Sequence, residues 1–133
     1  MFHLFVYGTL KTNGRKFQVC SESVTNVEKA YAVGIMKDLG AFPAMMEGVG
    51  TVHGEAISME DSVEEGVLVV LDRIEGYRPE NPDSSFYTRK KITVTTESGE
   101  DLEAWAYFLE DAHNRLTIKS GIWEGGTTRY VVG

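Results

Sequence analysis

Apolar residues along the chain group into several strand-like runs and one stretch with helical spacing. Residues 2–7 are almost continuously apolar and precede Gly8, which predicts a buried strand that ends at this glycine. Strand-like composition returns at residues 31–36 and 51–57. Gly54 lies inside the latter run, and a glycine within a strand predicts a bulge or the close approach of another backbone segment.

A helix is predicted after the third of these runs. Its apolar residues recur at i, i+4, i+7, i+8 and i+11, the spacing of one helix face: Val63, Val67, Val70, Leu71 and Ile74. Ser62 and Glu65 match a capping box at the start of the helix. Gly76 predicts a left-handed stop at the end.

Two further strands are predicted beyond the helix. Residues 78–84 contain two prolines and predict an exposed loop. Residues 86–96 alternate between two faces, and residues 102–109 follow a turn at 97–100, which predicts a β-hairpin. Because strands outnumber helices, the pattern indicates an α+β domain built on a curled antiparallel or mixed sheet.

The length of 133 residues fits one domain, residues 1–133. Hydrophobic residues make up 42% and charged residues 25%, the balance of a soluble globular protein. The sequence has 13 Lys+Arg against 20 Asp+Glu, a formal net charge of -7. This excess of negative charge argues against binding to nucleic acid or to an anionic membrane, since both need a cationic face.

Other features bear on the compartment. No apolar run approaches the roughly 18 to 20 residues that cross a bilayer. A signal peptide has a basic stretch before its apolar segment, and no such stretch precedes the first apolar run here. Cys20 is the single cysteine and suits a reducing compartment, so we expect a cytoplasmic protein. The three histidines lack the spacing of local metal-binding motifs, and we expect no metal.

The first candidate for chemistry is the segment after the N-terminal strand, Tyr7-Gly8-Thr9-Leu10. A glycine directly after a buried strand exposes successive backbone amides, which form a donor site for an anion or oxyanion. The alternative is a turn that only ends the strand. The segment is not a P-loop, because no GKS or GKT follows at the required spacing.

The second candidate is Glu75, in the last turn of the predicted helix. The negative end of the helix dipole disfavours a charged carboxylate there, and burial would raise its pKa toward the range of a general base and acid. The alternative is a solvated glutamate at a helix end. Tyr87 and Tyr107 lie on predicted strands, where each either faces a pocket or fills the core. Trp105 and Trp123 are interpreted as packing residues.

Taken together, these motifs resemble the γ-glutamylcyclotransferase-like superfamily, which includes the γ-glutamylamine cyclotransferases and the AIG2-like proteins. The resemblance runs from residue 1 to about residue 109. It rests on four motifs in order: YGTL at 7–10, GE at 54–55, LDRIEGY at 71–77 and FYTR at 86–89. The sequence departs from the familiar pattern after Gly76, where the loop to Ser85 is long and holds two prolines.

The resemblance implies a small barrel-like mixed sheet with few short helices, and a pocket between the YGTL loop and the motif glutamate. In that family the loop amides hold the γ-glutamyl moiety and the glutamate is the acid/base. The substrate-binding role falls on Tyr7, Gly8, Thr9 and Leu10, the acid/base role on Glu75, and Tyr87 matches a tyrosine that lines the pocket. The implied reaction releases 5-oxoproline and an amine from a small γ-glutamyl substrate and needs no cofactor.

Two other functions stay open at this point. The same fold could keep a small-ligand pocket without turnover, as a binding module, or the YGTL segment could be only a turn in a structural or interaction protein. Glu75 favours the enzyme over the binding module, because a binding module does not need a proton-transfer group. The sequence names neither the leaving amine nor an oligomeric state.

Overall fold

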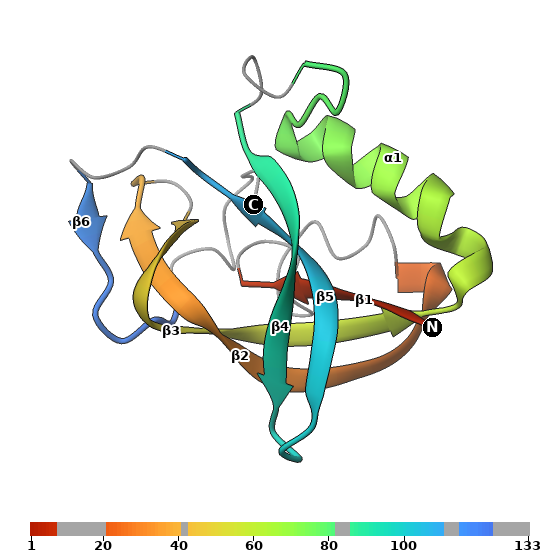
Figure 1. Ribbon diagram of the computed structural model, residues 1–133, viewed down its shortest axis with the longest axis horizontal. Coiled ribbons are helices and arrows are strands. Elements are labelled where there is room, and N and C mark those ends of the chain that lie inside the picture. Colours follow the sequence, from red (N-terminus) through yellow and green to blue (C-terminus); the bar gives the residue numbers. More distant parts are fainter. Residues whose placement is uncertain (8–20, 41–42, 82–85, 111–114, 124–133) are drawn as a thin grey trace.

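Strands make up most of the structure, a computed structural model that describes residues 1–7, 21–40, 43–81, 86–110 and 115–123 (Figure 1). The strands are β1 (Phe2–Val6), β2 (Val24–Asp38), β3 (Pro43–Met59), β4 (Thr88–Thr96), β5 (Asp101–Phe108) and β6 (Leu116–Thr117). The helices are α1 (Glu64–Glu75) and two single 3-10 turns, η2 (Ser21–Ser23) and η3 (Asp61–Val63).

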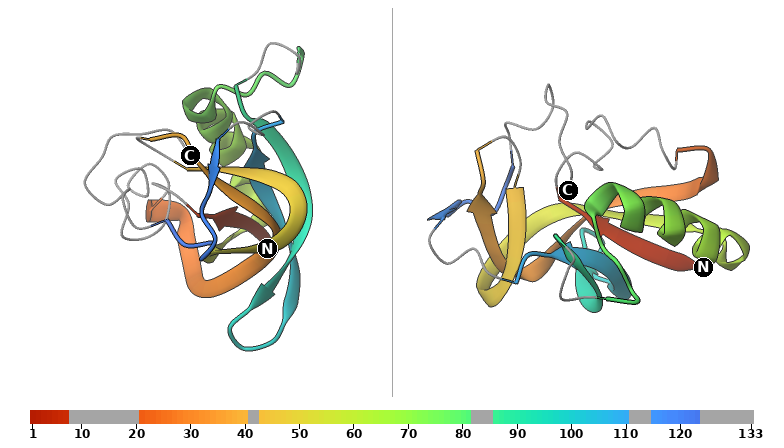
Figure 2. Two further views of the ribbon diagram at one scale, coloured as in Figure 1. Left: turned by 90° about the vertical axis from the view of Figure 1, so that its left-hand side faces the viewer. Right: turned by 90° about the horizontal axis from the view of Figure 1, so that it is seen from above.

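The sheet closes on itself as a barrel. Its strand order is β3-β1-β5-β4-β2, and β2 also pairs with β3, so the first and last of these strands are neighbours. The pairing of β1 with β5 is parallel and the others are antiparallel. Figures 1 and 2 show α1 beside β1 on the outside of this barrel. The predicted α+β class with a barrel-like mixed sheet is confirmed.

Strand β1 separates two hydrophobic cores, which explains its continuous apolar sequence. Phe5 and the adjoining Tyr7 belong to the core inside the barrel. Phe2, Leu4 and Val6 belong to the second core, where Leu68 and Leu71 of α1 pack. Because successive side chains of a strand point to opposite faces, burial of both faces favours apolar residues at nearly every position, and His3 is the half-buried exception.

Strands β2 and β3 form one long antiparallel hairpin that extends well beyond the predicted runs at 31–36 and 51–57. The residues added to β2 are mostly half-buried or exposed and leave little apolar pattern, whereas residues 43–46 of β3 are buried and apolar and were missed by the predicted run. Gly54 is a site of close backbone approach, as predicted, since a Cβ there would overlap the carbonyl oxygen of Val6. The predicted β4–β5 hairpin is confirmed.

The two ends of α1 differ from each other in how well the sequence predicted them. The capping box was wrong: the N-cap residue is Val63, which has no side-chain cap hydrogen bond. Turn η3 comes directly before the helix and contains Ser62, so this residue does not occupy the N-cap position from which its side chain would accept from the Glu65 amide. Gly76 ends the helix in the left-handed conformation, φ 68°, as predicted.

The buried face of α1 is rotated from the predicted one. Its buried residues are Leu68, Leu71, Asp72 and Glu75, whereas Val70 is 43% exposed. The prediction counted apolar residues only, and two of the four buried positions carry carboxylates. The helix therefore presents two acidic side chains to the protein interior.

Candidate active site

Glu75 is the last residue of α1, and its side chain is 1% exposed. An ionised Glu75 would add to the raised pKa of Tyr7, Tyr87 and Tyr107, so its carboxyl group lies within electrostatic range of all three phenols. These tyrosines come from the end of β1, from the residue before β4 and from β5. Four separate segments of the chain therefore meet around one buried carboxyl group.

Each of the three phenol groups donates a hydrogen bond. Tyr7 Oη donates to the Tyr107 carbonyl at 2.6 Å and accepts from the Met45 amide at 3.2 Å. Tyr87 Oη donates to the Pro43 carbonyl at 2.8 Å, and Tyr107 Oη donates to Asp72 Oδ1 at 2.7 Å. The hydroxyl groups thus hold strands and helix together around Glu75.

Burial is the largest cause of the raised pKa of each tyrosine, and all three values lie well above the usual 10. These phenols therefore stay neutral at physiological pH. Burial and the negative end of the helix dipole both disfavour a charge at the Glu75 position. A carboxyl group in such surroundings is suited to accept and return a proton.

Asp72 lies one helical turn before Glu75 on the same buried face. Its Oδ1 accepts the hydrogen bond from Tyr107 and forms an ion pair of 3.0 Å with Arg89 Nε. Burial raises the pKa of Asp72, while the Tyr107 hydrogen bond and the Arg89 charge act in the opposite direction. The sequence predicted no role for Asp72 or Arg89, although Asp72 belongs to the motif LDRIEGY and Arg89 to FYTR.

The structure brings together three of the predicted site residues, Tyr7, Glu75 and Tyr87. It adds Tyr107, for which the sequence left pocket and core as alternatives. Gly8, Thr9 and Leu10 lie outside the described residues, as does Cys20. The i, i+3 spacing of Asp72 and Glu75 was the one available signal for Asp72, because it places both carboxylates on one helix face.

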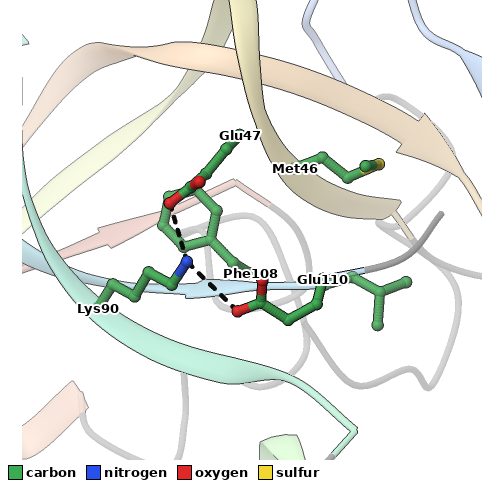
Figure 3. Close-up of a pocket in the computed structure, with 6 residues that line it drawn as sticks. Met46, Glu47, Lys90, Phe108 and Glu110 are labelled. Atoms are coloured by element: carbon green, nitrogen blue, oxygen red, sulfur yellow. Dashed lines mark hydrogen bonds and ion pairs between the residues drawn. The ribbon is translucent and has the colours of Figure 1, made fainter. Parts of the chain in front are cut away.

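A cavity of about 220 Å³ lies elsewhere, on the barrel-facing side of the β4–β5 hairpin (Figure 3). Lys90 Nζ bridges two carboxylates there, Glu47 Oε1 at 2.8 Å and Glu110 Oε1 at 3.3 Å, above the Phe108 ring. Arg89 and Tyr107 alternate with these side chains and so face the opposite way, toward α1. Glu75 does not line this cavity.

Trp123 is buried in the barrel core, in line with its interpretation as a packing residue. Trp105 is half-buried and has a further role, because its Nε1 donates to Glu64 Oε2 at 3.0 Å. Among the described residues, no three His, Cys, Asp or Glu side chains gather as metal ligands would. No helix within the same ranges is long and apolar enough to span a membrane.

The closed mixed barrel with α1 on its outside is the fold of solved structures of γ-glutamylcyclotransferase type. The profile of the family "Gamma-glutamyl cyclotransferase, AIG2-like" matches residues 4–125. The chain therefore belongs to this family. A similar protein of Vibrio cholerae, named "Putative gamma-glutamylcyclotransferase", is 34% identical over 131 residues, which cover 92% of this chain and 96% of that protein.

Several solved structures share the fold, among them the following two. YkqA from Bacillus subtilis superposes with a TM-score of 0.67 at 24% identity, covering 92% of this chain but only 39% of that longer chain. Protein ytfP from Escherichia coli superposes with a TM-score of 0.60 at 25% identity, covering 92% of this chain and 96% of that one. The second match spans nearly the full length of both proteins.

Proposed function

We propose that the protein is a γ-glutamyl cyclotransferase that releases 5-oxoproline and an amine from a γ-glutamyl amine or γ-glutamyl amino acid. The observation that carries the proposal is Glu75, a carboxyl group buried at a helix end beside Tyr7, the residue that leads into the YGTL motif. Family membership supports a cyclotransferase-like enzyme, and the position of Glu75 supports the proton-transfer role.

In the proposed reaction the substrate supplies its own nucleophile. Glu75 removes a proton from the α-ammonium group, and the free amine attacks the γ-carbonyl carbon of the same molecule to form the five-membered ring. As the tetrahedral intermediate collapses, Glu75 returns this proton to the leaving nitrogen and the C–N bond breaks. The second proton of the ring nitrogen then passes through Glu75 to the released amine, which leaves as an ammonium ion. Because the attack is intramolecular, holding the substrate folded supplies much of the rate through effective concentration.

The other predicted site residues complete the proposal. The amides of Gly8, Thr9 and Leu10 bind the γ-glutamyl moiety and stabilise the developing oxyanion. Tyr7 and Tyr87 supply neutral walls, since their hydroxyl groups donate to backbone carbonyls. Neutral walls keep water and competing charge away from Glu75, which favours proton exchange with the substrate.

The proposal includes the setting of the enzyme. The substrate is a small molecule and no cofactor takes part, because one carboxyl group and backbone amides supply all the steps above. The net charge of -7 supports a protein that binds neither nucleic acid nor membrane. A single cysteine supports a cytoplasmic location.

The test is incubation with a panel of γ-glutamyl amines and γ-glutamyl amino acids, with 5-oxoproline scored by mass spectrometry. We expect product from at least one class, and none from the same substrate with Glu75→Gln beyond the uncatalysed rate. Thermal stabilisation by 5-oxoproline without turnover on any substrate would instead identify a binding module. If the protein neither binds 5-oxoproline nor turns over any of these substrates, the proposal is contradicted.

A further inference from the structure

Asp72 is fixed from two strands at once. Its Oδ1 atom accepts the Tyr107 hydroxyl of β5 at 2.7 Å and faces Arg89 Nε of β4 at 3.0 Å. The negative charge of Asp72 strengthens both contacts, and its side chain is only 10% exposed. A carboxylate held in this way cannot move without the helix that carries it, and Glu75 lies about 4.5 Å further along that helix axis.

Tyr107 also holds the other side of the site. Its main-chain carbonyl accepts the hydroxyl group of Tyr7, while its own hydroxyl group binds Asp72. One residue of β5 therefore contacts both the chain entering the YGTL motif and the helix that ends at Glu75. The distance between these two parts depends on the position of Tyr107.

Arg89 is itself held in place by aromatic rings. Its guanidinium carbon lies 4.5 Å from the Trp105 ring centroid and 5.6 Å from that of Tyr77. A guanidinium between two rings has little freedom, so the charge facing Asp72 has a defined position. Tyr77 is the second residue after the helix, which adds a contact just beyond Glu75.

We propose that Tyr107, Asp72 and Arg89 form a positioning network that sets Glu75 at its working distance from Tyr7. The inference rests on the proposed function and deepens it, because it gives roles to the aspartate of LDRIEGY and the arginine of FYTR. None of the three is a catalytic residue. Each acts through Glu75 or Tyr7.

The competing explanation is a purely structural link between helix and sheet. The chain offers a matched control for it, because a second link joins α1 to β5 at the opposite end of the helix, from Trp105 Nε1 to Glu64 Oε2 at 3.0 Å. Glu64→Ala breaks that link far from Glu75. Lys91→Met removes another cation over the Trp105 ring, at 4.8 Å, without touching Asp72.

The central variant is Tyr107→Phe, which deletes the bond to Asp72 and keeps the carbonyl that Tyr7 uses. A misplacement near 1 Å costs up to about 100-fold in rate, so we expect kcat to fall about 10- to 100-fold with KM nearly unchanged. Glu64→Ala and Lys91→Met should keep the wild-type kcat. All assays are run at least about 10 °C below the Tm of each variant, so that loss of folding does not enter.

Arg89→Lys and Arg89→Met provide a second, independent series. Lysine keeps the charge toward Asp72, so Arg89→Lys should have a higher kcat than Arg89→Met. If the link is only structural, the two variants should have equal kcat values and differ in Tm. A Tyr107→Phe variant with lowered Tm but unchanged kcat would overturn the inference. So would an equal loss of kcat in Glu64→Ala.

A measurement that needs no substrate turnover tests this inference separately from the proposed function. The 13C chemical shift of the Glu75 side-chain carboxyl carbon, assigned with Glu75→Gln, should move in Tyr107→Phe and stay in place in Glu64→Ala. If the wild type releases no 5-oxoproline, the proposed function fails and this shift still tests the geometry. An unmoved resonance in Tyr107→Phe overturns the positioning network in either case.

Discussion

The Phe86 amide donates a hydrogen bond of 2.8 Å to the Gly76 carbonyl, which closes the loop between α1 and β4 at its base. Glu75 stands directly before one partner and Tyr87 directly after the other. The segment at which the sequence departs from the familiar pattern thus begins and ends beside the proposed catalytic residue. Its closure fixes both site residues whatever the loop contains.

Substitution at Gly76 tests this closure. Gly76 has φ 68°, and an added Cβ would lie 3.2 Å from Phe86 Cβ, so we expect Gly76→Ala to lower the free energy of unfolding by about 1–2 kcal/mol. Gly76→Asn should cost less of this free energy, because asparagine tolerates the left-handed conformation better. Chemical denaturation of both variants measures the difference. Equal costs would show that the contact with Phe86 dominates over the backbone conformation.

Glu75→Gln separates catalysis from stability. The change keeps the shape of the side chain and removes the proton acceptor, so we expect turnover to fall by about 10²- to 10⁴-fold. The Tm should hold or rise, because a buried carboxylate at a helix C-terminus is costly. Single-turnover 5-oxoproline release and thermal unfolding are measured on the same preparation. A stable variant with wild-type turnover would remove Glu75 from the mechanism.

Three buried tyrosines predict steep loss of stability in alkali. Burial raises the pKa of Tyr7, Tyr87 and Tyr107 above 10 in the folded state. Above about pH 10 the unfolded chain loses these protons and the folded chain keeps them, so the free energy of unfolding falls as pH rises. Each tyrosine lowers the free energy of unfolding by about 1.4 kcal/mol per pH unit, and the three together by roughly 4 kcal/mol per pH unit.

The measurement is chemical denaturation between about pH 9 and about pH 11, with tyrosinate absorbance followed alongside. Tyr87→Phe should reduce the slope of the free energy of unfolding against pH by about 1.4 kcal/mol per pH unit. Ionisation of all tyrosines at about pH 10 without unfolding would contradict the burial of these phenols.

Alanine substitution at Gly54 tests the close approach of β3 to β1, and the same substitution at Gly66 in α1 is its control. An added Cβ at Gly54 would overlap the Val6 carbonyl, so Gly54→Ala should cost about 1–3 kcal/mol of the free energy of unfolding. Gly66 lies in α1, and an added Cβ there would meet open space. Gly66→Ala should therefore raise the free energy of unfolding by about 0.5–1 kcal/mol. Denaturation curves of the two variants should shift in opposite directions. A neutral Gly54→Ala would show that β1 and β3 can separate.

The parts of the fold that the sequence predicted are those determined by local chemistry. Strand β1 was evident because both of its faces are buried, and the helix end was evident because Gly76 alone suits the left-handed position. The N-terminal cap was wrong because a 3-10 turn, which Ser62 and Glu65 do not reveal, comes before the helix.

Local chemistry alone named the YGTL segment and Glu75 as candidates, and the family resemblance added their roles and the role of Tyr87. Tyr7, Glu75 and Tyr87 lie near one another in the structure, and their roles stay predictions. Asp72 and Arg89 belong to different elements and find each other only when β4 lies against α1. Their partnership is long-range, so neither spacing nor composition could show it. The same holds for Tyr107, whose two hydrogen bonds reach 35 and 100 residues along the chain.

These separations also govern how the protein folds. Forming the bond between Tyr7 and Tyr107 requires closing a loop of 100 residues, and distant pairings slow the search for the native state. Strand β1 pairs with β5 across about 100 residues of sequence, so we expect the surroundings of Glu75 to form late in folding. A folding intermediate that lacks β5 would therefore have a formed helix and no working enzyme.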